Sequence, residues 1–483
     1  MNCNLNVEMK TRRNFITTSG IAALGTLTGI PSLVLSNTKT AAKQNYVSRR
    51  PPLQKRTFVS DAVEAAIIGA KKQISDPELA WMFENCYPNT LDTTIKHYSL
   101  EGKPDTFVIT GDIDAMWLRD STAQIWPYLP LTANDEKLSL LVEGVINRQT
   151  KCVLIDQYAN AFNYDGSSSP EHSADLTEMK PGVFERKYEL DSLCYVIRLA
   201  YRYWKVTGNT RPFDEDWAKA MKLIVQTLKE QQRKNGDGPY KFQRKSIWTR
   251  ATAQGTGFGN PVKPTGLICS VFRPSDDSTI FPYLIPSNFF AVASLRQLSE
   301  MAKQILNDEP FSAVCGNLAD EVNSALEKYA VAKHFKFGKV FAYEIDGYGS
   351  IVNMDDPNVP NLLSLPYFSG IDTKNEVYQN TRAMILSSYN PYYVEGKWLG
   401  MGSPHTGLNM IWPMSYIMQA ITSTDKNEIN QCIKILKETH AETGFMHESF
   451  NCNNPKEYTR SWFAWANTIF GELILKILKE HSL

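Results

Sequence analysis

The feature that most constrains this chain is a long series of amphipathic helical segments that come in pairs. From Ser60 onward, apolar residues recur at helical spacing in about twelve segments. Several segments open with residues typical of helix N-caps, such as Asn134, Ser287 and Asp425. The expected helices cover residues 61–71, 77–86, 116–128, 134–152, 189–204, 211–233, 287–306, 309–330, 375–388, 406–422, 426–439 and 461–479. Paired helices in this number predict an all-α fold, a double ring of helices known as an (α/α)6 barrel or six-hairpin toroid.

Four long loops rich in Gly, Pro, Ser and aromatic residues separate the expected helices. They cover residues 162–184, 235–283, 338–368 and 442–460. Loops longer than about 15 residues inside a compact domain usually bind or catalyse, so we expect long active-site loops on one face of the barrel. A superhelical array of helix pairs is the alternative architecture, although its regular sequence repeat is not visible here. A short strand is expected at residues 106–110, leading into a charged motif.

The N-terminus reads as a targeting segment. Arg12 and Arg13 precede a weakly apolar run at 21–35 that Gly, Thr and Pro interrupt, as in a twin-arginine signal peptide. A membrane anchor is the alternative, but a spanning helix needs about 20 predominantly apolar residues. We therefore expect a signal peptide at 1–36, a linker or N-terminal arm at 37–57 and one catalytic domain at 58–483. The expected location is outside the cytoplasm, in the periplasm, with no membrane attachment after signal removal.

The composition excludes some partners and favours others. Lys and Arg number 51 and Asp and Glu also 51, which leaves no basic field for nucleic acid. The chain has 10 Trp and 22 Tyr, and aromatic rings suit the flat C–H faces of sugars. Apart from Cys3, seven widely spaced cysteines form no metal-binding pattern. Most are expected to be buried thiols, with one disulfide possible.

The densest group of charges lies at residues 110–121, Thr-Gly-Asp-Ile-Asp-Ala-Met-Trp-Leu-Arg-Asp-Ser. Arg119 and Asp120 next to the ring of Trp117 suit the wall of a polar pocket. The alternative is a helix N-terminus that Asp112 or Asp114 caps.

Two further loops carry carboxyl groups in apolar settings. Hydrolysis of a glycosidic bond needs two carboxyls, one protonated and one ionised. Asp276 and Asp277 are adjacent and repel each other, so one tends to keep a proton, and Arg273 lies beside them. A helix cap followed by an acidic first turn explains this pair equally well. Glu448 follows a glycine turn in an aromatic loop, which favours a site role.

Two histidines and a second acidic spot complete the candidates. His447 precedes Glu448, and His405 lies in the glycine-rich segment 400–407, where ligand contact and packing are both open. Glu189 and Asp191 open an expected helix, where capping is the favoured role. No nucleophile elbow, Walker loop, dinucleotide-binding glycine motif, HExxH or calcium loop occurs. A metal-free acid and base pair without a cofactor fits best.

Five segments in order resemble glycoside hydrolase family 125, over the chain from about residue 58 to the end. They are residues 111–121, 272–277, 284–288, 447–450 and 460–467. The resemblance implies an (α/α)6 barrel that removes α-1,6-linked mannose from non-reducing ends, with inversion and without a metal. It also implies a mannose-containing oligosaccharide or N-glycan as partner.

The same resemblance implies roles for single residues. An aspartate of the Asp276–Asp277 pair would be the general acid and Glu448 the general base. The wider similarity to glucoamylase-type enzymes implies that Arg119 and Asp120 bind the terminal sugar and that Asp276 is the proton donor, with Asp277 as the alternative. The full set expected to contact substrate comprises Trp117, Arg119, Asp120, Arg273, Asp277, His405 and His447. An exo-α-glucosidase of glucoamylase type and a non-catalytic glycan-binding protein remain as alternatives, although the latter would lack one of the two carboxyls.

Overall fold

The computed structural model describes residues 46–100, 102–167 and 171–480. The expected signal peptide at 1–36, and the expected linker up to residue 45, lie outside the described residues. A compact unit begins at Tyr46. Its first residues pack onto the helices that follow, since the Tyr46 ring lies 5.2 Å from that of Trp81 and Arg50 pairs with Glu64 and Asp92.

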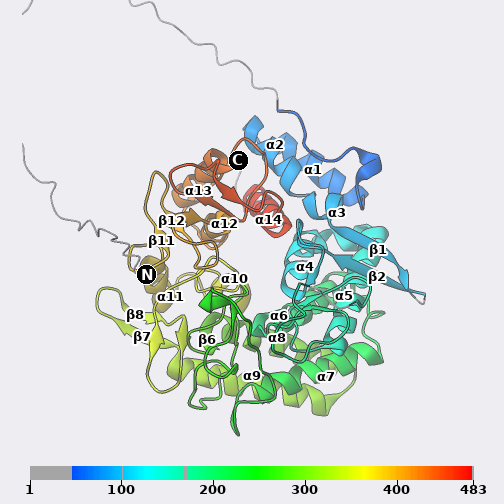
Figure 1. Cartoon of the computed structure of the whole chain (residues 1–483). Coiled ribbons are helices and arrows are strands. Elements are labelled where there is room, and N and C mark those ends of the chain that lie inside the picture. Colours follow the sequence, from blue (N-terminus) through cyan, green and yellow to red (C-terminus); the bar gives the residue numbers. More distant parts are fainter. Residues whose placement is uncertain (1–45, 101, 168–170, 481–483) are drawn as a thin grey trace, which may run out of the picture. The chain divides into compact units, whose positions relative to one another are not determined.

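The helices of this unit alternate between an inner and an outer ring (Figure 1). The inner helices are α4 (Leu118–Ile125), α6 (Leu190–Thr207), α8 (Ile285–Gln304), α10 (Leu365–Ser369), α12 (Pro413–Ile421) and α14 (Ala464–Glu480). The outer helices are α1 (Asp61–Gln73), α2 (Pro77–Cys86), α3 (Asn89–Thr93), α5 (Glu136–Ile155), α7 (Glu215–Glu230), α9 (Glu309–Tyr329), α11 (Glu376–Ile385) and α13 (Lys426–Thr439). Contacts run from α4 through α6 and α8 to α10, and from α12 through α14 back to α4. The all-α (α/α)6 barrel predicted from the sequence is confirmed.

Local sequence explains where many of these helices begin. The Asp425 side chain accepts a hydrogen bond from the Asn427 amide at the start of α13, so this predicted cap is confirmed. The other two predicted caps are wrong. Asp135, one residue after Asn134, caps α5, and α8 already begins at Ile285, where Pro286 occupies the first turn. The short helices α3 and α10 were not expected.

Short strands tie the long loops together. The hairpin β1 (Ile95–Leu100) and β2 (Lys103–Val108) contains most of the strand expected at 106–110. Three three-stranded sheets follow: β3 (Met116–Trp117) with β4 (Ala161–Phe162) and β5 (Val183–Glu185); β6 (Tyr283–Leu284) with β9 (Glu344–Ile345) and β10 (Ile351–Val352); and β13 (Met410–Ile411) with β14 (Ser449–Asn451) and β15 (Tyr458–Thr459). The remaining pairs are β7 (Val331–His334) with β8 (Gly338–Phe341), and β11 (Tyr393–Val394) with β12 (Gly400–Met401). The helix expected at 406–422 is therefore wrong in its first half, which contains β13.

The barrel closes where the N-terminal part of the unit meets the start of its last helix. Gly111 forms an isolated bridge with Phe463, and the Ala464 amide donates to the Thr110 carbonyl at 3.1 Å. Gly111 has a φ of 128°, and a Cβ at this position would overlap the carbonyl oxygen of Trp462. Only glycine fits this close approach of two backbones. The bridge brings the segment 110–121 next to the segment that precedes α14.

The seven cysteines within the described ranges are all free and buried, which confirms that they behave as small hydrophobic residues and leaves the possible disulfide unformed. Among the helices that the structure describes, none combines the length and the apolar character needed to cross a membrane.

Candidate active site

Six of the residues predicted for the site line one cavity of about 670 Å³. These six are Trp117, Arg119, Asp120, Asp276, His405 and Glu448. The cavity lies where three inner helices begin. Trp117, Trp412 and Phe463 each precede the first residue of α4, α12 or α14, and all three line it. Helix N-termini carry partial positive charge, so this end of the barrel favours the carboxylates that gather there.

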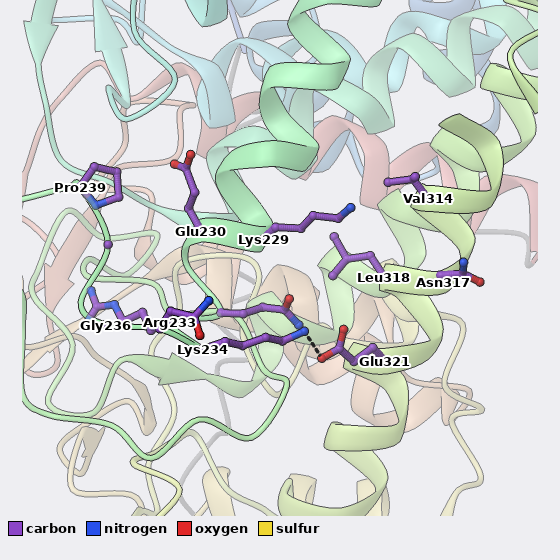
Figure 2. Close-up of a pocket in the computed structure, with 13 residues that line it drawn as sticks. Lys229, Glu230, Arg233, Lys234, Gly236, Pro239, Val314, Asn317, Leu318 and Glu321 are labelled. Carbon is purple, nitrogen blue, oxygen red and sulfur yellow. Dashed lines mark ion pairs between the residues drawn. The ribbon is translucent and has the colours of Figure 1, made fainter. Parts of the chain in front are cut away.

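A second cavity of about 590 Å³ shares no lining residue with the first. It is bordered by the C-terminal end of α7, the loop after it and α9, and Figure 2 shows the ion pair between Lys234 and Glu321 on its wall. No residue predicted for the site lines it, and no aromatic side chain does. The first cavity is therefore the candidate active site.

Asp276 reaches the cavity through an unusual backbone turn. Its φ is 64°, a left-handed conformation that costs a non-glycine residue roughly 1–3 kcal/mol and gathers at functional sites. Its Oδ1 accepts hydrogen bonds from Trp117 Nε1 at 3.2 Å, from Arg119 Nη2 at 3.2 Å and from Asn160 Nδ2 at 2.8 Å. No helix begins at this turn, because α8 starts only at Ile285, so the capping alternative for Asp276 and Asp277 is wrong.

The neighbours of Asp276 in its motif point elsewhere. Asp277 does not line the cavity, and its Oδ1 lies 3.2 Å from Nδ1 of His405 and 3.5 Å from Nε of Arg250. Arg273 is buried against Glu344, with 2.6 Å between Nε and Oε1, and does not line the cavity either. The predicted contact of Arg273 and Asp277 with the pocket is thus not seen. Of the two adjacent aspartates, only Asp276 lines the cavity.

His405 lines the cavity, and its pKa depends on its hydrogen bond to Asp277. Burial lowers the pKa of His405, but the hydrogen bond to Asp277 and the nearby charges of Glu448 and Asp276 outweigh this and raise it to about 9. The imidazole therefore carries a positive charge at neutral pH and offers a hydrogen bond donor to the cavity.

Glu448 approaches the same cavity from the sheet of β13, β14 and β15. Its Oε2 accepts a hydrogen bond from the Thr459 hydroxyl at 2.9 Å, and its Oε1 lies 3.7 Å from Nη1 of Arg460. Arg460 also donates through Nε to Asp112 Oδ1 at 2.9 Å, and its own φ is 44°. Asp112 is therefore an ion-pair partner, and the N-cap of α4 is Trp117, so the capping alternative for Asp112 and Asp114 is wrong.

His447 does not line the cavity, contrary to expectation. Its ring stacks on Tyr458, with centroids 3.7 Å apart and an angle of 4° between the planes. The side chain is buried, and burial lowers the pKa of His447 to about 4. This histidine is a neutral packing element beneath the loop that presents Glu448.

Arg119 lies at the centre of a cluster of carboxyl groups. The guanidinium is 2.7 Å from Asp120, 3.1 Å from Glu189, 3.5 Å from Asp191 and 3.2 Å from Asp276. The expected capping role of Glu189 and Asp191 is wrong. Glu189 occupies the N-cap position of α6, but its side chain makes no hydrogen bond to the helix backbone and faces Arg119 instead.

Sequence reasoning missed the wall formed by Glu185, Lys187 and Arg244. Glu185 Oε1 pairs with Lys187 Nζ at 3.2 Å and with Arg244 Nη2 at 2.9 Å, and all three residues line the cavity. The only available signal was the charged triplet that follows Phe184. Arg460 was also missed as a neighbour of Glu448, although it lies in one of the five segments singled out above.

The chain is similar to known proteins in sequence and in structure. The sequence pattern described as metal-independent alpha-mannosidase (GH125) matches residues 76–475. The meiotically up-regulated gene 157 protein of Schizosaccharomyces pombe is 42% identical over 451 residues, which cover 89% of this chain and 88% of that protein.

Two solved structures are similar to the fold. A metal-independent alpha mannosidase of Streptococcus pneumoniae, in a non-productive complex with α-1,6-mannobiose, is 41% identical with a TM-score of 0.84, covering 88% of this chain and 99% of that one. A bacterial glucoamylase in complex with acarbose is 12% identical with a TM-score of 0.50, covering 84% of this chain and 55% of that one. The second likeness concerns the fold alone.

Proposed function

The chain belongs to the metal-independent α-mannosidases of glycoside hydrolase family 125, and we propose that it releases non-reducing terminal α-1,6-linked mannose by an inverting single displacement. That it is a glycoside hydrolase acting on α-mannosides follows from the family. The linkage, the exo mode of attack and the stereochemistry are our proposal. A mannose-containing oligosaccharide or N-glycan is the proposed substrate, because α-1,6-mannobiose occupies the similar pneumococcal enzyme.

The observation that carries this proposal is that Asp276 and Glu448 line one cavity but are held by separate groups. Trp117, Arg119 and Asn160 bind Asp276, whereas Thr459 and Arg460 hold Glu448. Inversion needs an acid and a base that act independently on the two faces of the sugar, with room for a water molecule.

In the proposed reaction, Asp276 protonates the leaving oxygen while the bond from that oxygen to the sugar carbon breaks. Glu448 takes a proton from a water molecule that attacks the opposite face of the sugar ring. Arg119 and Asp120 hold hydroxyl groups of the terminal mannose, and the Trp117 ring shapes the wall beside it.

Hydrolysis of α-1,6-mannobiose in the presence of EDTA tests the proposal, with NMR reading the anomer that is released first. We expect β-mannose first. Release of α-mannose first would replace inversion by retention, and release of glucose from isomaltose in preference would favour the glucosidase alternative. Glu448→Gln and Asp276→Asn should each abolish turnover while folding is retained. Asp114→Asn is the matched control, because Asp114 lines the cavity but pairs with Lys96 and should remain active.

We also propose that the protein is exported to the periplasm through the paired arginines Arg12 and Arg13. The test is fractionation of cells that produce the full chain, compared with a variant in which both arginines are replaced by lysine. Periplasmic activity that is lost in the double variant would support export by this route, and unchanged activity in the periplasm would contradict it.

A further inference from the structure

The carboxyl groups around Arg119 outnumber the cations available to them. Glu189 and Asp276 both approach the same guanidinium nitrogen, Nη2, at 3.1 Å and 3.2 Å. The Glu189 side chain is fully enclosed, and that of Asp276 is 24% exposed. Two other cations act on Asp276, but Lys187 is already paired with Glu185 and His405 with Asp277. Several ionised carboxylates cannot share one buried arginine without a large desolvation penalty, so this cluster retains a proton.

Glu189 Oε1 and Asp276 Oδ1 both lie within 3.2 Å of Nη2 of Arg119, and repulsion between two carboxylates held at one nitrogen favours a proton on one of them. Burial raises the pKa of Glu189 well above its ordinary value, against the charge of Arg119 and with the help of Asp276 and Asp191. Burial also raises the pKa of Asp276, but the charges of Arg119 and Lys187 outweigh this effect and lower the pKa of that carboxyl below its ordinary value. These opposite pKa shifts favour a proton on Glu189 and an ionised Asp276.

This arrangement places a proton one carboxyl away from the residue that must donate it. We propose that Glu189 and Asp276 share a single proton, and that Glu189 is the positioning residue that keeps the general acid supplied with it. The proposal rests on the proposed function, in which Asp276 protonates the leaving oxygen.

Each turnover of the proposed reaction takes up as many protons from solvent as it releases. A glycosidic oxygen accepts a hydrogen bond from Asp276 only if that carboxyl is protonated, so substrate binding favours transfer of the proton from Glu189 to Asp276. Asp276 then gives the proton to the leaving oxygen, which receives the electron pair of the broken bond. Both carboxyls are left ionised, and solvent restores one proton after the product departs. Glu448 releases to solvent the proton that it took from water.

Neighbouring groups affect the orientation and the pKa values of Glu189 and Asp276. Ser192 Oγ donates to Glu189 Oε2 at 2.8 Å, which fixes the orientation of this carboxyl. Within the described residues, neither oxygen of Asp191 has a hydrogen bond partner, and burial raises its pKa to about 7. The charged and titratable groups that face the pair are Arg119 and Asp120 from α4, Glu185 and Lys187 at and after β5, Asp191 from α6, and His405 from the loop after β12.

The first test is Glu189→Gln, which keeps the shape and removes the shared proton. The basic limb of the pH profile of kcat/KM reports the loss of the last proton from the pair. We expect this limb to move to lower pH by roughly one unit or more, because Asp276 would then face Arg119 and Lys187 alone. Turnover of α-1,6-mannobiose should fall by roughly 10- to 100-fold. Turnover of a 2,4-dinitrophenyl α-mannoside, whose leaving group needs no proton, should change little.

A merely structural role predicts equal losses on both substrates and an unmoved basic limb, and either result would overturn the proposal. Asp191→Asn is the matched control, since Asp191 contacts the same arginine from the same helix. If Asp191→Asn reproduced the whole effect, the role would not belong to Glu189. The proposed function fails separately, if Asp276→Asn still hydrolyses mannobiose.

Two further measurements keep the test sharp if Glu189→Gln folds poorly. Ser192→Ala removes the donor that favours the ionised form of Glu189, so the basic limb should move in the opposite direction, to higher pH. In addition, the infrared difference spectrum between wild type and Glu189→Gln at neutral pH should contain the C=O stretch of a protonated carboxyl. Absence of that band together with an unmoved limb in Ser192→Ala would contradict proton sharing.

Discussion

Asp277 lies outside the cavity, yet its carboxylate sets the charge of His405, which lines it, across 3.2 Å between Oδ1 and Nδ1. This pairing explains how two adjacent aspartates take different roles. Asp276 faces the cavity, and Asp277 holds the cationic His405 at its wall.

The first prediction concerns the Asp277–His405 pair. Asp277→Asn should lower the pKa of His405 from about 9 towards its ordinary value of about 6.5, because the charge that stabilises the imidazolium is lost. Titration of the imidazole by NMR measures the change. Asp114→Asn should leave the titration where it is in the wild type. A wild-type His405 that titrates near the ordinary value would contradict the pairing.

The second prediction concerns the indole of Trp117. Trp117→Phe removes the N–H that donates to Asp276 Oδ1 and keeps an aromatic ring in the wall. A hydrogen bond to a charged group is worth about 1.5–3 kcal/mol, so kcat should fall by roughly 10-fold or more with little change in Tm. Trp398→Phe is the matched control, because Trp398 donates to Glu438 at the same distance of 3.2 Å outside the cavity. Equal kcat values for the two variants would count against this role.

The third prediction concerns barrel closure. Gly111→Ala should destabilise the protein by about 3 kcal/mol or more, because the added methyl group overlaps the Trp462 carbonyl in a bridge that cannot widen freely. Gly102→Ala is the control. Gly102 also has a positive φ, of 81°, but open space surrounds its Cβ position, so only about 1 kcal/mol is expected. Urea unfolding of both variants measures the difference in the free energy of unfolding. Similar losses of stability would show that the backbone at the bridge shifts to accommodate the added methyl group.

The fourth prediction follows from the buried, neutral His447. Its pKa is about 4 in the folded protein and about 6.5 in the unfolded chain, so the unfolded chain binds more protons between these values. Stability should therefore fall as pH falls through this window, by about 2 kcal/mol between pH 7 and pH 5 from this residue alone. His447→Phe keeps a ring against Tyr458 and should remove that part of the acid sensitivity. Chemical denaturation at the two pH values tests this, and an unchanged pH dependence would refute it.

The helical periodicity of apolar residues in the sequence predicted most of the helices of the fold. The bounds predicted for α2 and α13 agree with the structure, because both helices combine a capping aspartate with a clear apolar stripe. The segment before α12 is apolar too, yet Asn409 has a φ of 64° and Met410 pairs with Asn451. That pairing partner lies far along the chain, and no local pattern reveals it.

For the site, charged residues in apolar surroundings identified Asp276 and Glu448, but the direction in which each side chain points could not be predicted. His447 and Asp277 are each adjacent to a cavity residue in sequence, and neighbouring side chains on an extended or turning backbone point to different sides. Lys187 and Arg244 were missed for a different reason. Lys187 lies two residues after Glu185, where its side-chain direction could not be read, and Arg244 comes from a separate loop that only the folded chain brings to Glu185.

The bridge between Gly111 and Phe463 has a consequence for biosynthesis. Thr110 and Arg460, which meet beside it, are 350 positions apart, so a ribosome exposes the first half of the pocket long before its partner emerges. Until α14 is released, the growing chain lacks both the bridge to Gly111 and the arginine beside Glu448. The pocket is complete only after the segment that precedes α14 has folded against residues 110–121. The protein therefore suits a transport route that accepts finished molecules, as the proposed twin-arginine signal would require.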